Sequence, residues 1–543
     1  MVATARVQEP RQTSRTGTIL VWTAFGAAAL LSLVLLLHLG RGLTWFFDEW
    51  NWIQDRRTGS VDDFLRNHNG HLIALPILAY KIEWSWFGLG VYTAMRVYTV
   101  LLHLATCGVL LVWLRRRLRN EFALALVVAV LFLGYAWQDL LWPSQTQYFG
   151  SMLGGIAALV FLDRRDVTGD VLASIALGVA LASSGIGLPF VGAVGLILVL
   201  RRNTWRRLWV PVAPLALYGL WYARYGASQA KGENLHRVPG YVEKAGASAA
   251  GALFGRGIDT GHVLAAALAV LVIVTVAVRR RMSPELAGIV ALPILFWTLT
   301  AMSRAQSNEP GASRYLYPGA IFVVLVLGQL IDDPHWPRTT RSRVVAVTAA
   351  AVLLVVSLAG NVVQLRDGAS GLRDVSTFVK AELAALELAR GHVNPDYQPD
   401  LSRAPQLFAG PYFRAVDDLG SPADSIRELR AAAPEVRAAA DAVLLGAIGV
   451  KLAPGAPAGS SCTTVMPTDG VATTERTGDA PTLVVTADGG TGVDVASRNL
   501  ADGFETGSIG TVEPGTTRSF TLPTVRSGPW TVRLTSRAPF RVC

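Results

Sequence analysis

Long apolar stretches, separated by short polar connections, fill the first two thirds of the chain. A helix needs about 20 apolar residues to cross a bilayer, and on that basis the pattern predicts about eleven crossings. The predicted spans are residues 19–39, 92–114, 122–137, 146–162, 171–183, 186–200, 208–222, 263–278, 286–301, 316–331 and 344–358. Arg41 and Asp48 follow the first span without a small-residue cleavage site, so we expect a retained anchor.

The pattern changes at about residue 361, where the apolar runs end. Residues 361–450 carry helical signals, notably at 375–390 and 426–445. In residues 451–543, Gly, Pro and Thr separate short runs in which apolar and polar residues alternate. This pattern is typical of a small β-sandwich. The predicted fold class is a polytopic α-helical membrane protein, residues 19–360, with a C-terminal extracytoplasmic α/β-containing domain that ends in this sandwich. A short Ala/Pro/Gly/Ser linker is expected at 453–461.

Arginine clusters indicate the orientation of the spans. They occur in every second loop, at Arg115, Arg116, Arg117 and Arg119, at Arg164 and Arg165, at Arg201, Arg202, Arg206 and Arg207, at Arg279, Arg280 and Arg281, and at Arg338, Arg341 and Arg343. Because positive loops are retained inside, we expect a plasma-membrane protein with a cytoplasmic tail, residues 1–18, and an external C-terminal domain. The net charge of +10 is largely this signal, so nucleic acid is not an expected partner.

Composition and cysteine usage agree with this topology. Hydrophobic residues make up 51% of the chain and charged residues only 16%, which is too apolar for one soluble core. Cys107 lies inside a predicted span, whereas Cys462 and Cys543 fall in the predicted external domain, where an oxidising environment permits a disulfide between them. Two unrelated free thiols are the alternative.

The first external loop, residues 41–70, contains two adjacent acids, Asp48 and Glu49, among aromatic residues that include Trp50 and Trp52. A carboxylate in a partly desolvated site can act as general base on an acceptor hydroxyl, while aromatic faces stack on sugar or lipid. The alternative is an aromatic belt at the headgroup level with two solvated acids.

The same loop ends with His68 and His71, whose i, i+3 spacing can place both side chains on one face. Such a pair can contact a phosphate or sugar, or contribute to a metal site. Two histidines without a fixed third ligand are an ordinary occurrence, so the phosphate or sugar contact is favoured. No cofactor is predicted with certainty, and a divalent metal stays an alternative.

This arrangement resembles a known family. A first span, an external loop opening with Asp-Glu, a His-containing element and then Pro76 are similar to the polyprenyl-phosphate-sugar-dependent glycosyltransferases of the GT-C superfamily. Relatives in that superfamily include protein O-mannosyltransferases, lipid A aminoarabinose transferases and mycobacterial-type arabinofuranosyltransferases. The resemblance covers residues 19–358 and implies that Asp48 is the catalytic base, with Glu49 as its neighbour. The chain departs from the mannosyltransferases at His71, because they have prolines directly after the first His.

Further polar residues fall on the predicted outer side. Arg96 lies one turn into a span, where a charge needs an anionic partner or reaches toward the headgroups. Arg304 and Arg314 lie at the two ends of one short loop. They are candidates for binding the donor phosphate, as are His71 and Arg96. The candidates for sugar or acceptor contacts are His68, Trp50, Trp52, Gln145, Gln147 and Tyr315.

The residues together predict an inverting glycosyltransferase that moves a sugar from a polyprenyl-phosphate donor to a cell-envelope glycan, lipid or protein on the extracytoplasmic side. The β-rich end is similar to carbohydrate-binding modules, by analogy alone. Two alternatives stay open: a lipid or polysaccharide transporter or flippase, and a non-catalytic envelope assembly protein.

Overall fold

The computed structural model describes residues 15–202, 204–333, 335–456 and 462–543, and the chain divides into two compact units. The helical unit takes in the described part of Met1–Arg41 together with Gly59–Lys81 and Thr93–Ser370. The terminal unit comprises Gly42–Thr58, Ile82–Tyr92 and Gly371–Cys543. Most of the predicted tail, and residues 457–461 of the predicted linker, lie outside the described residues.

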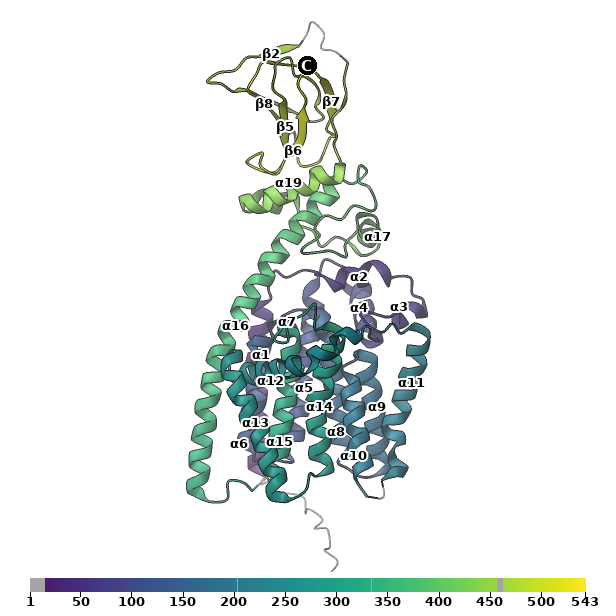
Figure 1. Cartoon of the computed structure of the whole chain (residues 1–543), viewed down its shortest axis with the longest axis vertical. Helices are drawn as coiled ribbons and strands as arrows, with labels where there is room; N and C mark the ends of the chain where they lie inside the picture. Colours follow the sequence, from purple (N-terminus) through teal and green to yellow (C-terminus); the bar gives the residue numbers. More distant parts are fainter. Residues whose placement is uncertain (1–14, 203, 334, 457–461) are drawn as a thin grey trace, which may run out of the picture. The chain divides into compact units, whose positions relative to one another are not determined.

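The helical unit is a bundle of helices (Figure 1). Its α-helices are α1 (Arg15–Leu39), α3 (Val61–Leu65), α5 (Tyr92–Arg115), α6 (Asn120–Leu131), α7 (Trp137–Leu141), α8 (Thr146–Leu162), α9 (Val167–Ser183), α10 (Gly187–Leu200), α11 (Trp209–Tyr225), α12 (Val238–Leu253), α13 (Ile258–Arg279), α14 (Pro284–Arg304), α15 (Ser313–Ile331) and the first part of α16 (Thr340–Leu388). Short 3-10 turns are η1 (Gly134–Ala136), η2 (Pro143–Gln145), η3 (Trp205–Arg207) and η4 (Gly232–Arg237). α8 packs on α9, α10 on α14, and α12 on both α13 and α15.

Seven helices of the described chain are long and apolar enough to cross a membrane. They are α1, α5, the stretch Asn120–Leu141 with α6 and α7, α13, α14, α15 and α16. Large apolar side chains on α13 and α16, such as Val263, Ile273 and Val345, are exposed. Apolar surfaces of this kind are unfavourable in water but compatible with lipid, so the chain is a mostly helical protein whose apolar helices suit a membrane.

Four predicted spans form shorter helices. All eleven predicted segments contain helix, although 122–137 is divided between α6, η1 and the first residue of α7. α8, α9 and α11 have 17 residues and α10 has 14. At a rise of about 1.5 Å per residue, none reaches the roughly 30 Å of a hydrocarbon core. The count of eleven crossings therefore stays a prediction.

Arg96 holds the end of α1. Its side chain is 4% exposed, and its guanidinium donates to the carbonyl oxygens of Gly40 (2.5 Å) and Leu36 (2.6 Å). The last carbonyls of a helix lack helical partners, so a buried cation satisfies them well. The bonds that the structure gives the Arg96 guanidinium are to backbone oxygens at the end of α1, and the expected role at the donor phosphate stays a prediction.

The predicted domain boundary at residue 361 falls inside a continuous helix. α16 runs for 49 residues, and Asn361 is fully buried in the helical unit. Its side chain donates to Ala252 O (3.0 Å) and accepts from Tyr135 N (3.1 Å). The change in composition at about residue 361 therefore lies within α16, and the two compact units divide further along this helix, between Ser370 and Gly371.

The terminal unit contains α2 (Asp48–Asp55), the end of α4 (Ala74–Phe87), the last part of α16, α17 (Ala409–Leu419), α18 (Ile426–Ala431) and α19 (Pro434–Ile448). The single helix expected at 426–445 is two helices, because Pro434 occupies the first turn of α19, where its missing N–H costs no hydrogen bond. Asp441 of α19 is buried and accepts from Asn499 N (2.9 Å) and Leu500 N (3.2 Å), so it joins the helix to the strands.

The strands form the predicted sandwich. They are β1 (Ala453–Pro454), β2 (Thr463–Val465), β3 (Ala472–Gly478), β4 (Thr482–Thr486), β5 (Val493–Arg498), β6 (Ser508–Val512), β7 (Thr517–Thr521), β8 (Trp530–Ser536) and β9 (Phe540–Val542). The orders are β1-β7-β4-β9-β2 and β3-β8-β5-β6, and the paired strands are antiparallel. Thr463 pairs with Val542, which brings the neighbouring Cys462 and Cys543 together in the predicted disulfide.

A substitution at Gly40 tests the role of Arg96. A methyl group on Gly40 would overlap the Arg96 guanidinium, whereas a methyl group on Gly26 of α1 would meet nothing within 4 Å. We expect Gly40→Ala to lower the free energy of unfolding by roughly 1–3 kcal/mol, because Arg96 must leave its carbonyl partners. Thermal unfolding in detergent measures this, with Gly26→Ala as the control. Equal stability of the two variants would contradict the assignment.

Candidate functional site

The predicted external loop is divided between the two units. Asp48, Glu49, Trp50 and Trp52 belong to the terminal unit, and His68 and His71 belong to the helical unit, as do the candidate arginines. The two groups of residues are therefore described separately.

Asp48 is the first residue of α2 and is partly exposed. A carboxylate in the first turn is stabilised by the helix dipole. Phe47, directly before it, has φ 50° and ψ −118°, a conformation that a bulky side chain rarely adopts. Backbone strain of this kind is found preferentially at functional sites, where the surrounding structure holds it. Asp48 is thus an accessible carboxylate on a strained, fixed turn.

Glu49 has a different environment. It is fully buried and accepts hydrogen bonds from Phe46 N (2.9 Å) and from the Tyr92 hydroxyl (2.9 Å). These bonds fix the turn that precedes α2. Of the two adjacent acids, Asp48 is therefore the one that solvent and ligands can reach, and Glu49 is placed as a structural partner of the turn.

The tryptophans predicted to stack on sugar form a buried core beneath α2. Trp50 and Trp52 are both 0% exposed. The Trp50 indole N–H donates to Trp45 O (3.1 Å), and its ring packs edge-on against Tyr412. The Trp45 indole N–H donates to Leu89 O (2.7 Å). Neither Trp50 nor Trp52 has a ring face at the surface, so burial argues against the predicted sugar contact for both.

Glu83, on the last part of α4, is a buried acid that the sequence prediction did not include in the site. It is 5% exposed, and neither carboxylate oxygen has a hydrogen-bond partner in the described chain. Burial, and then the negative charge of Glu49, raises the pKa of Glu83 to about 8. Glu83 is therefore largely protonated at neutral pH. An acid followed by Trp84 and Trp86 in sequence was the available signal.

In the helical unit, His68 and His71 pair across a tight turn. His68 N donates to His71 O (3.0 Å), and His71 N donates to His68 O (2.9 Å). Asn69 and Gly70 between them have φ 52° and 88°, which is typical of an Asn-Gly two-residue hairpin turn. Residues directly opposite each other in an antiparallel pair have side chains on the same face. The two histidines thus share a face as predicted, through a hairpin and not a helix.

Arg304 lies against this turn. Its guanidinium donates to Asn69 O (3.3 Å), and a side chain on Gly185 would overlap the His71 ring. Burial, followed by the charges of His68 and Arg304, lowers the pKa of His71 to about 4. At neutral pH His71 is therefore uncharged and can donate or accept a hydrogen bond. The positive charge that could attract a phosphate here is that of Arg304.

Arg304 and Arg314 are linked through Asn308, whose backbone N–H donates to Arg304 O (3.0 Å). Arg314 donates to the Asn308 side chain, and its guanidinium lies 5.4 Å from the centre of the Tyr315 ring. The structure thus brings together three of the predicted site residues, Arg304, Arg314 and Tyr315.

Gln145 and Gln147 are also in this part of the helical unit, at the start of α8. They are 2% and 6% exposed, and the Gln145 amide donates to Ser144 Oγ (3.1 Å). Asp139 is 0% exposed and was not predicted as a site residue. The signal that could have found it is an acid two residues beyond a predicted apolar span, since buried ionisable groups in such positions are seldom incidental.

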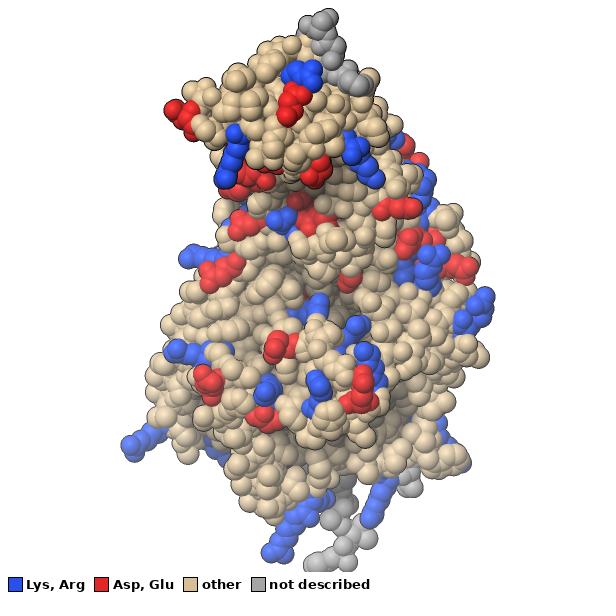
Figure 2. Space-filling view, turned by 45° about the horizontal axis from the view of Figure 1, so that its top comes forward, with Lys and Arg blue, Asp and Glu red and all other residues tan. Residues whose placement is uncertain are grey.

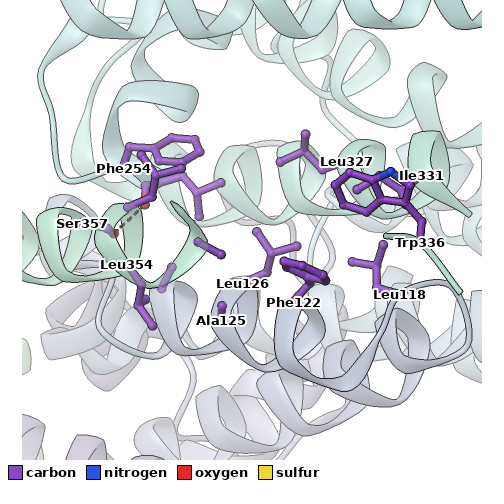
Figure 3. A pocket seen from close by; sticks show the side chains of 14 residues that line it. Leu118, Phe122, Ala125, Leu126, Phe254, Leu327, Ile331, Trp336, Leu354 and Ser357 are labelled. Atoms are coloured by element: carbon purple, nitrogen blue, oxygen red, sulfur yellow. Dashed lines mark hydrogen bonds between the residues drawn. The ribbon is translucent and has the colours of Figure 1, made fainter. Parts of the chain in front are cut away.

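An apolar cavity of about 180 Å³ lies among the helices of the helical unit. Its walls include Phe122 and Leu126 of α6, Leu327 of α15 and Leu354 of α16, with Trp336 at one end (Figure 3). The one polar side chain that lines it, Ser357, donates to Leu253 O (2.7 Å). The cavity therefore suits an apolar chain and not a polar headgroup.

Among the residues that the structure describes, no group of three or more His, Cys, Asp or Glu side chains is placed to hold a metal ion. On the face seen in Figure 2, acidic and basic side chains are interspersed. A comparison with protein-family models, with curated proteins and with solved structures finds no match for this chain.

The raised pKa of Glu83 predicts a pH dependence of stability. The folded state keeps a proton that the unfolded state loses above its ordinary value of 4.5, so stability should fall as pH rises from about 4.5 to about 8. The glutamine in Glu83→Gln does not titrate in this range. We therefore expect the stability of this variant to fall less than that of the parent as the pH rises.

The measurement is the thermal midpoint of the protein in detergent between pH 5 and pH 8. Glu513→Gln, at an exposed acid of the sandwich, is the matched control and should follow the parent. If Glu83→Gln and the parent show the same pH profile, Glu83 is ionised at neutral pH and its assignment is wrong.

Proposed function

We propose that this chain is an inverting glycosyltransferase that moves a sugar from a polyprenyl-phosphate donor to a cell-envelope glycan, lipid or protein. The observation that carries the proposal is the pair of arginines, Arg304 at the end of α14 and Arg314 at the start of α15, which are linked through the backbone and side chain of Asn308. Two guanidinium groups in one region suit a phosphate leaving group, which they can bind by bidentate hydrogen bonds.

Other features support a lipid-linked donor. The apolar helices are compatible with a membrane, and the apolar cavity between α6, α15 and α16 is compatible with part of an isoprenoid chain. The resemblance of the loop containing Asp48 to the GT-C superfamily supplies the reaction class, and no nucleotide-sugar motif is needed for it.

In the proposed reaction a carboxylate takes the proton of an acceptor hydroxyl as that oxygen bonds to the anomeric carbon, and the bond from that carbon to the phosphate oxygen breaks on the opposite face, so the configuration inverts. Asp48 is the candidate base in the terminal unit. Arg304 and Arg314 are the candidates in the helical unit for stabilising the charge of a departing lipid phosphate. Glu49 holds the turn that carries Asp48, through Phe46 and Tyr92.

The direct test supplies purified protein with a panel of synthetic polyprenyl-phosphate sugars and an envelope extract as acceptor, and measures release of the lipid phosphate. Release that depends on the acceptor supports the proposal. Movement of the intact lipid across a vesicle membrane without cleavage would instead make the chain a transporter.

The proposed topology is multi-pass, with the N-terminus in the cytoplasm and the sandwich outside, in agreement with the arginine pattern and with a disulfide between Cys462 and Cys543. Single cysteines at the exposed positions Val61, Gly232 and Gly490 should react with a membrane-impermeant thiol reagent in intact cells. Cysteines at Arg202 and Met282 should react only after permeabilisation.

The background for this labelling is low, because the chain has three cysteines, of which two are in the disulfide and Cys107 is buried. Labelling at Gly490 only after permeabilisation would place the sandwich in the cytoplasm and rule out an external active site.

The base assignment predicts different results for the two adjacent acids. Asp48→Asn keeps the shape of the side chain but removes its basicity, so kcat should fall by at least about 100-fold while the protein stays folded. Glu49→Gln alters a buried acceptor of two hydrogen bonds and should mainly lower the thermal midpoint.

Turnover and thermal unfolding of both variants decide between the roles. If Asp48→Asn keeps near-parental turnover while Glu49→Gln is folded but inactive, Glu49 is the base and Asp48 is not. Activity in both variants would remove this loop from the catalytic site.

A further inference from the structure

The segment from Asp139 to Thr146 contains an unusual group of buried hydrogen-bond acceptors. Apart from a contact with its own backbone N–H, the Asp139 carboxylate receives no hydrogen bond from the described residues. Gln145 Oε1 and Thr146 Oγ1 also have no partner there, although both residues are only 2% exposed. Buried polar atoms without partners lower stability and are few in native structures. Three such side chains within eight residues therefore point to a ligand that supplies the missing hydrogens.

The surrounding helices hold this segment firmly. Gln138 N donates to Ser313 Oγ (3.1 Å), and the same hydroxyl donates to Tyr135 O (2.8 Å). These two bonds join the first turn of α15 to η1 and α7, which are in contact with it. Asp139 and Arg314 follow Gln138 and Ser313 directly in sequence, and Asp139 lies within the electrostatic influence of Arg314. The acceptor group is therefore adjacent to a cation of the proposed phosphate site.

The chemistry of the two groups differs. An ionised phosphate mainly accepts hydrogen bonds, so it matches Arg304 and Arg314. Carboxylate and amide oxygens accept hydrogen bonds, so they match a ligand that donates them, and a sugar hydroxyl is such a donor. A neutral apolar chain would leave the acceptors of Asp139, Gln145 and Thr146 without partners.

We infer that Asp139, Gln145 and Thr146 bind free hydroxyl groups of the transferred sugar, and that they thereby select a polyhydroxylated glycosyl group over deoxygenated ones. This inference rests on the proposed function, whose donor it describes in more detail. A site built to bond a hydroxyl group rejects an analogue that lacks it, because its own buried acceptors then stay unpaired.

Two substitutions separate binding from folding. Thr146→Val replaces an unpartnered buried hydroxyl with a methyl group of similar size, and Asp139→Asn replaces an unpartnered buried carboxyl group with an amide. Neither change removes a bond to another side chain of the described residues, so the thermal midpoint should stay equal or rise. Asp479→Asn, at an exposed acid of the sandwich, is the matched control.

The readout is kcat/KM for the best polyprenyl-phosphate sugar of the donor panel and for its monodeoxy analogues. The parent should lose at least about tenfold when the bonded hydroxyl is removed from the sugar. Asp139→Asn and Thr146→Val should lose about as much on the complete sugar, and should no longer discriminate against the corresponding deoxy analogue. Arg304→Ala should weaken all donors equally, because they share the phosphate.

Each outcome has a distinct meaning. Release of lipid phosphate by the parent, with parental kcat/KM and parental discrimination in both variants, overturns the inference and leaves the proposed function intact. A uniform loss over all analogues together with a lower thermal midpoint also overturns it, since it shows a structural role. If the parent cleaves none of the donors, the proposed function fails and the inference fails with it.

Discussion

A polar group buried in an apolar helical bundle lowers stability unless a partner satisfies it, and this requirement governs the helical unit. Several polar side chains of this unit are bonded to backbone that is distant in the sequence. Arg96 bonds the carbonyls that end α1, Asn361 connects α16 with residues 135 and 252, and Ser313 joins α15 to η1 and α7. These side chains assemble the bundle, and their hydrogen-bonding capacity is used within it. Against them, the unpartnered acceptors of Asp139, Gln145 and Thr146 stand out.

Several buried polar groups near α2 in the terminal unit are also hydrogen-bonded. Trp45 and Trp50 are buried with their indole N–H groups bonded to carbonyl oxygens, and Glu49 receives two hydrogen bonds. The aromatic and acidic cluster that suggested a ligand site is therefore mostly the core beneath α2. Asp48 alone combines a strained preceding residue, a helix N-terminus and partial exposure. Chemical function at this loop, if it is the one proposed, depends on rigid packing by its neighbours.

Charge is also distributed by burial. The pKa of His71 is lowered and that of Glu83 is raised, so both side chains are mainly neutral near pH 7. The permanent cations Arg304 and Arg314 then supply the positive charge of the helical unit's candidate site. This division suits a reaction in which a phosphate leaves from a neutral sugar, because positive charge is needed at the phosphate and hydrogen-bond acceptors are needed at the hydroxyl groups.

The sequence by itself predicted the apolar helical segments and the β-rich C-terminal end, because periodicity and composition are local properties. It permitted a disulfide between Cys462 and Cys543 but left two free thiols as the alternative, and the structure shows the disulfide. Only the tertiary structure decided which polar residues are bonded within the fold. Arg96, Glu49 and Trp50 resemble ligand-binding residues in sequence, yet each bonds to backbone or side chains brought close by folding, and Trp52 is buried. Asp139 became visible for the opposite reason: it is buried, and the described fold provides its carboxylate with no partner from another residue. Hydrogen-bond satisfaction is a property of three-dimensional packing, so residue type and spacing cannot determine it.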